Sequence, residues 1–298
     1  MKEKIRQLVK KKNAIILAHN YQPAEIQEIA DLCGDSLELS IKAADTDADI
    51  IVFCGVQFMA ETASILSPEK QVLLPVPDAG CPMADMVTPE ALKAEKNRLG
   101  NPPVVTYVNS TAAVKALSHI CCTSANVIDV VNSLDTGEIL MTPDRNLARY
   151  AAAHTDKKIH LWDGCCPYHD TLSPEEVLKA KEEHPDALFM AHPECPPAVL
   201  AMADAVKSTS GMIQFAGEST RSSFIVGTET GLLYPLSKRH PDKKFYPASE
   251  RMFCHDMKKI KPADILASLE NSSGEVKVPE AIRKDALKAV QRMIDLKS

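Results

Sequence analysis

Three stretches of the chain share one pattern: IILAHN (15–20), VVTYVN (104–109) and ALFMAHP (187–193). Each is a short apolar run that ends in polar residues, and a run of this length is typical of a buried strand in a parallel sheet. A charged segment with a helical pattern precedes each run, at residues 2–12, 88–98 and 173–184. The order of helix and then strand therefore occurs three times.

The spacing after each run repeats as well. A small hydroxyl residue follows 17 residues after a matched position: Ser36 after His19, Ser124 after Tyr107 and Thr209 after His192. A second apolar run comes next in each unit, at DIIVFCG (49–55), EILMTPD (138–144) and SFIVGTE (223–229). A third run follows at VLLPVP (72–77), KIHLWD (158–163) and KFYPAS (244–249). Such coincident offsets indicate an internal repeat of about 85 residues.

Each third run leads to a cysteine, and the matched cysteines are Cys81, Cys166 and Cys254. A proline stands eight residues after each of them, at Pro89, Pro174 and Pro262. The first two prolines follow Thr88 and Ser173, which is the pattern of a helix N-cap followed by proline, whereas the third follows Lys261 and lacks the cap. This register selects Cys166 over the neighbouring Cys165.

Strands that alternate with helices predict an α/β fold with parallel sheets. We expect three αβα domains with small parallel sheets, related by a pseudo-threefold axis, around a central cavity. Their predicted bounds are 1–82, 83–167 and 168–257. The C-terminal segment 258–298, with an amphipathic helix over 276–296, is expected to pack on the first domain.

The composition excludes several classes of protein. The net charge of −6 argues against a nucleic-acid partner, and no apolar run is long enough for a membrane span. The charged N-terminus lacks the apolar core of a secretory signal, so we expect a cytoplasmic protein. In a reducing compartment the nine cysteines act as core residues, metal ligands or nucleophiles.

Ligands of parallel sheets bind beyond the carboxyl ends of the strands, where the three matched cysteines are expected to meet. Three thiolates from distant positions suit an iron–sulfur cluster, and a [4Fe–4S] cluster with three cysteine ligands would keep one iron open as a Lewis acid. The remaining cysteines are interpreted as core residues: Cys33, Cys54, Cys121, Cys122, Cys165 and Cys195.

Other polar residues are expected at the same place. His19, Tyr21, Tyr107, Asn109, His192 and Glu194 follow the first strands. The hydroxyl residues Ser36, Ser124 and Thr209 precede expected helices, where free N–H groups favour an anion. They indicate a substrate with several carboxylate or phosphate groups, whereas His169, near Cys166, could be a supporting group or simply exposed.

Three other functions stay open at this point. An electron-transfer protein would need a fourth cysteine ligand, for which Cys195 is the candidate. A zinc hydrolase with three cysteines is a second alternative, and a metal-free anion-binding module is a third.

In their order and spacing, the motifs resemble the quinolinate synthase family over nearly the whole chain. The matching stretches are LAHNYQ (17–22), GDSLELS (34–40), FCGVQFMAE (53–61), AGCPMAD (79–85), YVNST (107–111), CTSAN (122–126), TPDRNLARY (142–150), GCCPYH (164–169), HPEC (192–195), GTETGL (227–232) and RMFCHDMKK (251–259). Cys165 departs from the residue types that the family often has before its second ligand, and the Pro-x-His that follows favours Cys166.

The resemblance implies a transferase of NAD biosynthesis that joins iminosuccinate to dihydroxyacetone phosphate, with release of quinolinate, phosphate and water. It implies a [4Fe–4S] cluster on Cys81, Cys166 and Cys254, and an L-aspartate oxidase or aspartate dehydrogenase as the source of the imine. The residues that match substrate contacts are His19, Ser36, Tyr107, Asn109, Ser124, His192, Glu194 and Thr209. Tyr21 and Glu194 match acid–base residues, and we expect His19, His192 and Tyr107 to assist them.

Overall fold

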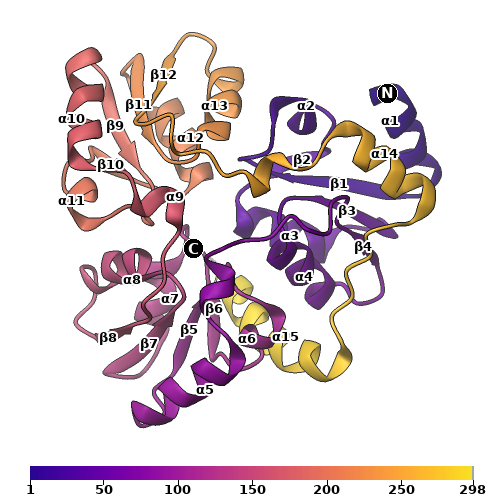
Figure 1. Cartoon of the computed structure of the whole chain (residues 1–298), viewed down its shortest axis with the longest axis horizontal. Coiled ribbons are helices and arrows are strands. Elements are labelled where there is room, and N and C mark those ends of the chain that lie inside the picture. Colours follow the sequence, from indigo (N-terminus) through magenta and orange to yellow (C-terminus); the bar gives the residue numbers. More distant parts are fainter. Residues whose placement is uncertain (297–298) are drawn as a thin grey trace.

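The structure, a computed structural model, describes residues 1–296 and contains three four-stranded sheets (Figure 1). All pairs of neighbouring strands within these sheets are parallel. The first sheet consists of β1 (Ala14–His19), β2 (Leu32–Gly34), β3 (Ile50–Cys54) and β4 (Gln71–Leu73). The second consists of β5 (Val104–Tyr107), β6 (Ile120–Cys122), β7 (Glu138–Thr142) and β8 (Lys158–Leu161). The third consists of β9 (Leu188–Ala191), β10 (Ala205–Val206), β11 (Ser223–Gly227) and β12 (Lys244–Pro247).

The three sheets have the same topology, which confirms the α/β repeat. Their strand orders are β2-β1-β3-β4, β6-β5-β7-β8 and β10-β9-β11-β12. In each sheet the two central strands are the apolar runs found in the sequence. The edge strands β2, β6 and β10 are only two or three residues long and lay outside the predicted runs.

The helices recur in the same positions around each sheet. The first unit contains α1 (Lys2–Lys11), α2 (Ala24–Gln27), α3 (Ser36–Asp45) and α4 (Gln57–Leu66). The second contains the 3₁₀ helix η1 (Ala84–Met86), α5 (Pro89–Arg98), α6 (Ala112–Lys115), α7 (Val127–Ser133) and α8 (Arg145–Ala152). The third contains α9 (Pro167–Asp170), α10 (Pro174–Glu183), α11 (Pro197–Leu200), α12 (Thr209–Glu218), η2 (Thr230–Leu232) and α13 (Leu233–Arg239).

The predicted helix starts are confirmed in detail. The Thr88 side chain accepts a hydrogen bond from the backbone N–H of Ala91, and the Ser173 side chain accepts one from that of Glu176. Lys261, at the start of α14 (Pro262–Asn271), gives no side-chain cap, and its own N–H donates to Asp264 at 2.8 Å. The repeat therefore includes the N-termini of these helices, although the third copy, at Lys261, lacks the capping side chain.

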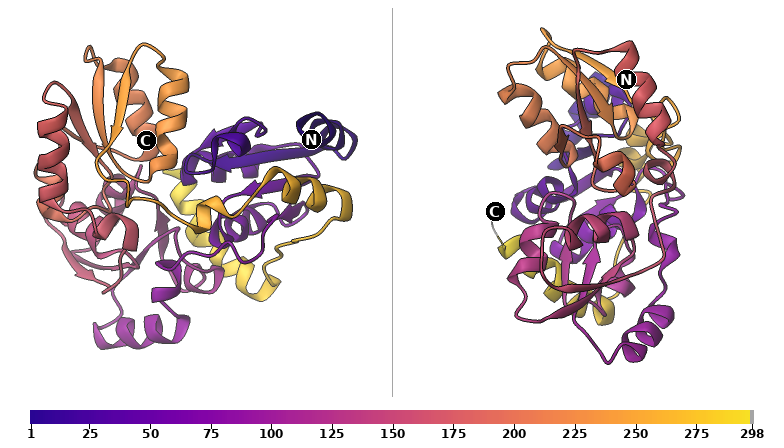
Figure 2. Two further views of the ribbon diagram at one scale, coloured as in Figure 1. Left: turned by 45° about the horizontal axis from the view of Figure 1, so that its top comes forward. Right: turned by 90° about the vertical axis from the view of Figure 1, so that its left-hand side faces the viewer.

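The C-terminal segment begins with η3 (Asp256–Lys258) and ends with α15 (Glu280–Asp295). The expected packing on the first unit applies to α14, which contacts α1. It also applies to α15, which lies against α4 of the first unit and, in addition, against α6 and β6 of the second (Figures 1 and 2). Helix α15 thus contacts two units. The unit boundaries at 82/83 and 167/168 stay predictions.

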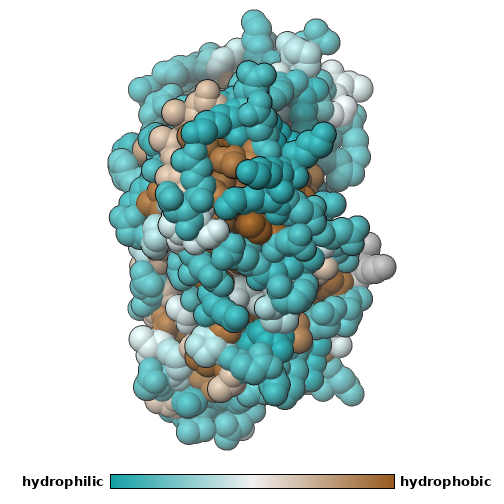
Figure 3. Space-filling model, turned by 90° about the vertical axis from the view of Figure 1, so that its right-hand side faces the viewer, coloured by the Kyte–Doolittle hydropathy of each residue, from teal (hydrophilic) through white to brown (hydrophobic). Residues whose placement is uncertain are grey.

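Among the described residues, none of the helices combines the length and the apolar character that a bilayer crossing requires. The face in Figure 3 is mostly hydrophilic, with small and scattered hydrophobic areas. Such scattered residues are ordinary on a folded protein.

Candidate active site

The three units meet at a central cavity of about 70 Å³. The first strand of each unit ends here, and the cysteine loops that follow β4, β8 and β12 also reach it. Every residue that the sequence singled out for the site lines this one cavity: His19, Tyr21, Ser36, Cys81, Tyr107, Asn109, Ser124, Cys166, His192, Glu194, Thr209 and Cys254. The convergence expected from the repeat is therefore confirmed.

The three cysteines share a local structure, because each precedes a short helix: η1, α9 or η3. Burial raises the pKa of Cys81 to about 12 and that of Cys254 to about 11, and it raises the pKa of Cys166 well above its usual value. Backbone N–H groups at the helix starts, such as those of Met83 and Ala84 near Cys81, lower these pKa values in part. Such thiols become thiolates only when a cation replaces the proton.

The two histidines are arranged alike. The Nδ1 atom of His19 accepts the backbone N–H of Tyr21 at 3.2 Å, and Nδ1 of His192 accepts that of Glu194 at 3.3 Å. Burial lowers the pKa of both rings to about 3. Each ring is therefore neutral with its proton on Nε2, and the Nε2–H of His192 donates to Ser124 Oγ at 3.2 Å.

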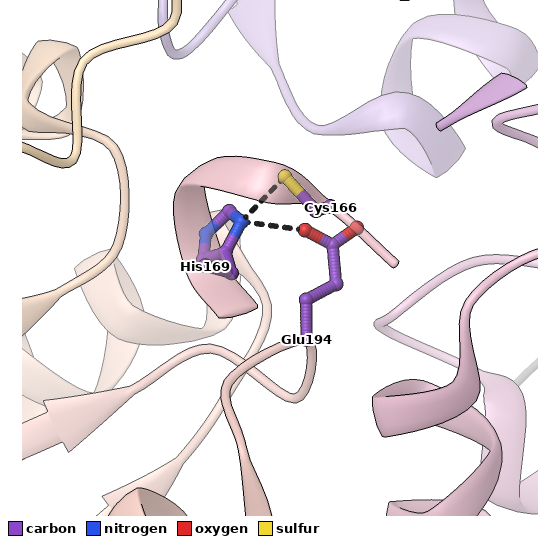
Figure 4. A group of neighbouring side chains, drawn as sticks. All are labelled: Cys166, His169 and Glu194. Carbon is purple, nitrogen blue, oxygen red and sulfur yellow. Dashed lines mark hydrogen bonds and ion pairs between the residues drawn. The ribbon is translucent and has the colours of Figure 1, made fainter. Parts of the chain in front are cut away.

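Glu194 belongs to a buried network in which His169 contacts both Cys166 and Glu194 (Figure 4). Its Oε2 accepts from His169 Nδ1 at 2.7 Å. Burial opposes the charge of Glu194, but the neighbouring His169 outweighs this effect and lowers the pKa of the carboxyl below its usual value. Burial and the Glu194 charge together raise the pKa of Tyr107 well above its usual value. The site thus pairs an ionised carboxylate with a protonated phenol.

A second chain of hydrogen bonds links this network to the first unit. The Tyr21 hydroxyl lies 2.5 Å from Thr228 Oγ1, which lies 2.8 Å from His169 Nε2. Burial raises the pKa of Tyr21 well above its usual value, so this phenol also stays protonated. Residues of the first and third units are therefore joined across the cavity through Thr228 and His169.

The hydroxyl residues lie as expected, but they do not cap the helices. Asp35 and Ser208 are the N-caps of α3 and α12, so Ser36 and Thr209 each occupy the first helical position. Thr209 Oγ1 accepts from Asn20 Nδ2 at 3.0 Å. Within residues 1–296, the buried Oδ1 of Asn109 has no hydrogen-bond partner, and a ligand that donates a hydrogen bond would satisfy it.

His169 is the site residue that sequence reasoning left undecided. Its position three residues after Cys166 was the only signal, and the contact at 3.1 Å from Nδ1 to the Cys166 sulfur appears only in the folded chain. Within the part of the chain described, Cys166, His169 and Glu194 are the one group whose ligand atoms lie close enough for a single metal ion, all within 4.8 Å. However, His169 Nδ1 already donates its proton to Glu194, which favours a hydrogen-bonded triad over a mononuclear site.

Comparison with known proteins agrees with the geometry. The family model of the quinolinate synthetase A protein matches residues 3–295. The chain belongs to the quinolinate synthetase A family. It is 56% identical to the quinolinate synthase of Geotalea uraniireducens over 294 residues, which cover 99% of this chain and 97% of the relative. It is 53% identical to that of Thermodesulfovibrio yellowstonii over 295 residues, with coverages of 99% and 97%. It is 52% identical to quinolinate synthase 2 of Methanosarcina acetivorans over 294 residues, with coverages of 99% and 95%.

The family match covers the whole fold and is not confined to the cavity. The match spans residues of all three units and of the C-terminal segment. Each cysteine, histidine and hydroxyl discussed above lies within the matched residues.

Proposed function

We propose that this chain is a quinolinate synthase that condenses iminosuccinate with dihydroxyacetone phosphate to form quinolinate, phosphate and water. The observation that carries the proposal is that one cavity collects every residue expected from the family resemblance, in a chain 52–56% identical to quinolinate synthases over 99% of its length. The reaction would be that of a transferase in the cytoplasmic synthesis of NAD. An L-aspartate oxidase or aspartate dehydrogenase would supply the imine.

The donor set of the cavity fits a [4Fe–4S] cluster. Cys81, Cys166 and Cys254 offer one thiol from each unit, and backbone N–H groups at the start of a short helix lie near each sulfur. Hydrogen bonds from such groups to the sulfurs are among the features that tune iron–sulfur clusters. When bound, the cluster supplies an open iron that acts as a Lewis acid towards a substrate oxygen.

Binding of the two anionic substrates rests on neutral donors in this proposal. His19 and His192 present Nε2–H groups, while Ser36 and Thr209 lie in the first turns of α3 and α12, whose N–H groups favour anions. The unpaired Asn109 Oδ1 would accept a hydrogen bond from a substrate N–H or O–H group. Holding both substrates in one orientation removes much of the entropic barrier to a bimolecular reaction.

Proton transfer is assigned by protonation state. Glu194 is ionised and can accept a proton from the carbon or nitrogen that forms a new bond, whereas Tyr21 and Tyr107 are protonated and can donate to a departing oxygen. A positioned acid or base contributes typically about 10²–10⁴-fold to the rate. His19 and His192 then hold the substrate oxygens instead of exchanging their own protons.

The test is an anaerobic assay. Protein purified without oxygen is mixed with dihydroxyacetone phosphate and freshly generated iminosuccinate, and quinolinate is measured. Formation of quinolinate over many turnovers, with loss of activity after iron is chelated, is the expected result. Iron-loaded protein that forms no quinolinate would refute the proposed reaction.

A further inference from the structure

The three cysteine loops are attached to their sheets by the same backbone hydrogen bond. In each unit, the residue three positions after the end of β3, β7 or β11 donates its N–H to the carbonyl two residues before the cysteine. The pairs are Gln57 to Ala79 at 2.8 Å, Arg145 to Gly164 at 2.7 Å and Thr230 to Met252 at 2.9 Å. The same backbone hydrogen bond is therefore present in all three units, so the residues around it can be compared position by position.

The residue just before that donor carries a carboxylate in two of the units. Asp144 Oδ2 accepts the backbone N–H of Cys166 at 2.9 Å, while Oδ1 accepts that of Leu147 at the start of α8, at 2.6 Å. Both oxygens are thus in use, and the side chain is only 2% exposed. One buried carboxylate joins the start of a helix to the main chain of a cysteine.

Glu229 repeats this arrangement in the third unit. Its Oε1 accepts the N–H of Cys254 at 3.1 Å, and its Oε2 accepts that of Gly231 at 2.8 Å. A side chain at Gly231 would clash, because its Cβ would lie 2.7 Å from Glu229 Oε2 and 2.5 Å from the carbonyl oxygen of Tyr21. The bond is therefore built into a tightly packed corner of the cavity.

The first unit lacks this feature. Val56 occupies the matched position, directly before Gln57 and 25 residues before Cys81, the same spacing as from Glu229 to Cys254. Valine cannot accept a hydrogen bond. An N-cap alone does not explain the two carboxylates, because serine or threonine would cap a helix equally well with one oxygen.

We propose that Asp144 and Glu229 are positioning residues for the metal ligands: each carboxylate fixes the main chain at its cysteine and so directs the sulfur towards the shared cluster. The inference rests on the proposed function, since it presupposes the cluster. Groups that orient metal ligands typically affect metal affinity by about 10–100-fold, although they do not touch the metal.

The two carboxylates differ in charge balance. Glu229 pairs with Lys258 Nζ at 2.8 Å, and Lys258 also donates to the Tyr21 carbonyl. Among residues 1–296, no lysine or arginine forms an ion pair with Asp144. Glu229 therefore acts on the Cys254 main chain with an ion-pair partner, whereas Asp144 acts on the Cys166 main chain without one.

Four variants distinguish a role in positioning the cysteines from a general contribution to the stability of the fold. Asp144→Ser keeps an oxygen for the helix cap but has none for Cys166, whereas Asp144→Glu copies the third unit and keeps both acceptors. Glu229→Gln leaves one acceptor for two N–H groups. Asp35→Asn is the matched control, since Asp35 is a buried N-cap carboxylate that accepts from Leu37, Glu38 and Ser208 and from no cysteine.

The experiment measures how fast iron passes from the anaerobically reconstituted protein to excess chelator, by the loss of visible absorbance. We expect release about 10–100-fold faster in Asp144→Ser and Glu229→Gln. Asp144→Glu should be close to the wild type, and Asp35→Asn should lower the unfolding midpoint without speeding release.

Two results would overturn the inference alone: wild-type release rates in Asp144→Ser and Glu229→Gln, or equally fast release in Asp35→Asn. If Asp144→Ser fails to fold, as judged by circular dichroism, Glu229→Gln gives the decision from the intact third unit. A wild-type protein that takes up no iron would overturn the proposed cluster and this inference together, and the quinolinate assay would separate that failure from the first two.

Discussion

At the scale of single residues, the chemistry of the site depends on which side chains are protonated. Glu194 is charged because His169 donates a hydrogen bond to it, while the two tyrosines are neutral because burial opposes their ionisation. The sequence could place Glu194 and Tyr21 at strand ends but could not predict these protonation states. They depend on burial and on neighbours that are distant in sequence.

Glu194→Gln should lower turnover by at least about 10²-fold, because the amide cannot take up a proton at neutral pH. The cluster should remain, since Glu194 is not among the proposed ligands. Turnover and iron content of the same preparation measure both effects. Glu182→Gln, on the exposed face of α10, is the control and should match the wild type. Wild-type turnover in Glu194→Gln would remove this residue from the mechanism.

The pKa values of His19 and His192 predict a pH dependence of stability. Both values fall from 6.5 to about 3 on folding, so the unfolded chain binds more protons between these limits. The free energy of unfolding should therefore fall as the pH drops below about 6.5, by about 2 kcal/mol for each ring at pH 5. Urea unfolding of the wild type and of His192→Asn at pH 7 and pH 5 measures this. An equal loss in the two proteins would contradict the assignment.

At the scale of elements, the repeat could be found from the sequence because central strands carry long apolar runs. The edge strands could not, since two or three residues such as Ala205–Val206 give no periodic signal and pair only through the sheet. The helix caps at Thr88 and Ser173 were visible because capping is encoded within four residues.

The degenerate cap at Lys261 predicts a gain in stability. Lys261→Ser should restore the cap that Thr88 and Ser173 supply in the other copies and raise the free energy of unfolding by about 0.5–1 kcal/mol. Thr88→Ala should lower it by about 1 kcal/mol. Thermal unfolding of both variants checks the pair. A Lys261→Ser protein less stable than the wild type would show that the three helix starts are not equivalent.

At the scale of the whole molecule, the C-terminal helix packs on the first unit as expected and also on the second, because its partner surface is formed by both. The apolar face of α15 was evident from its periodicity, but the sequence could not show that α6 and β6 of the second unit share it with α4. The same limit applied to His169, whose partners Glu194 and Thr228 are distant in sequence.

Met293→Ala should therefore destabilise the junction of two units. Met293 is fully buried, and removal of such a side chain costs about 2–5 kcal/mol. Lys288→Ala, on the exposed face of the same helix, should cost less than about 0.5 kcal/mol. Denaturant unfolding measures both. Equal effects would mean that α15 is not packed as described.

The central claim is that one cysteine from each unit holds a shared cluster. The most direct measurement is the iron and sulfide content of anaerobically reconstituted protein with single Cys→Ala substitutions. The account predicts that the variants at Cys81, Cys166 and Cys254 lose the cluster, while those at Cys165 and Cys195 keep wild-type iron and sulfide. A cluster that survives Cys166→Ala but is lost in Cys165→Ala or Cys195→Ala would contradict it.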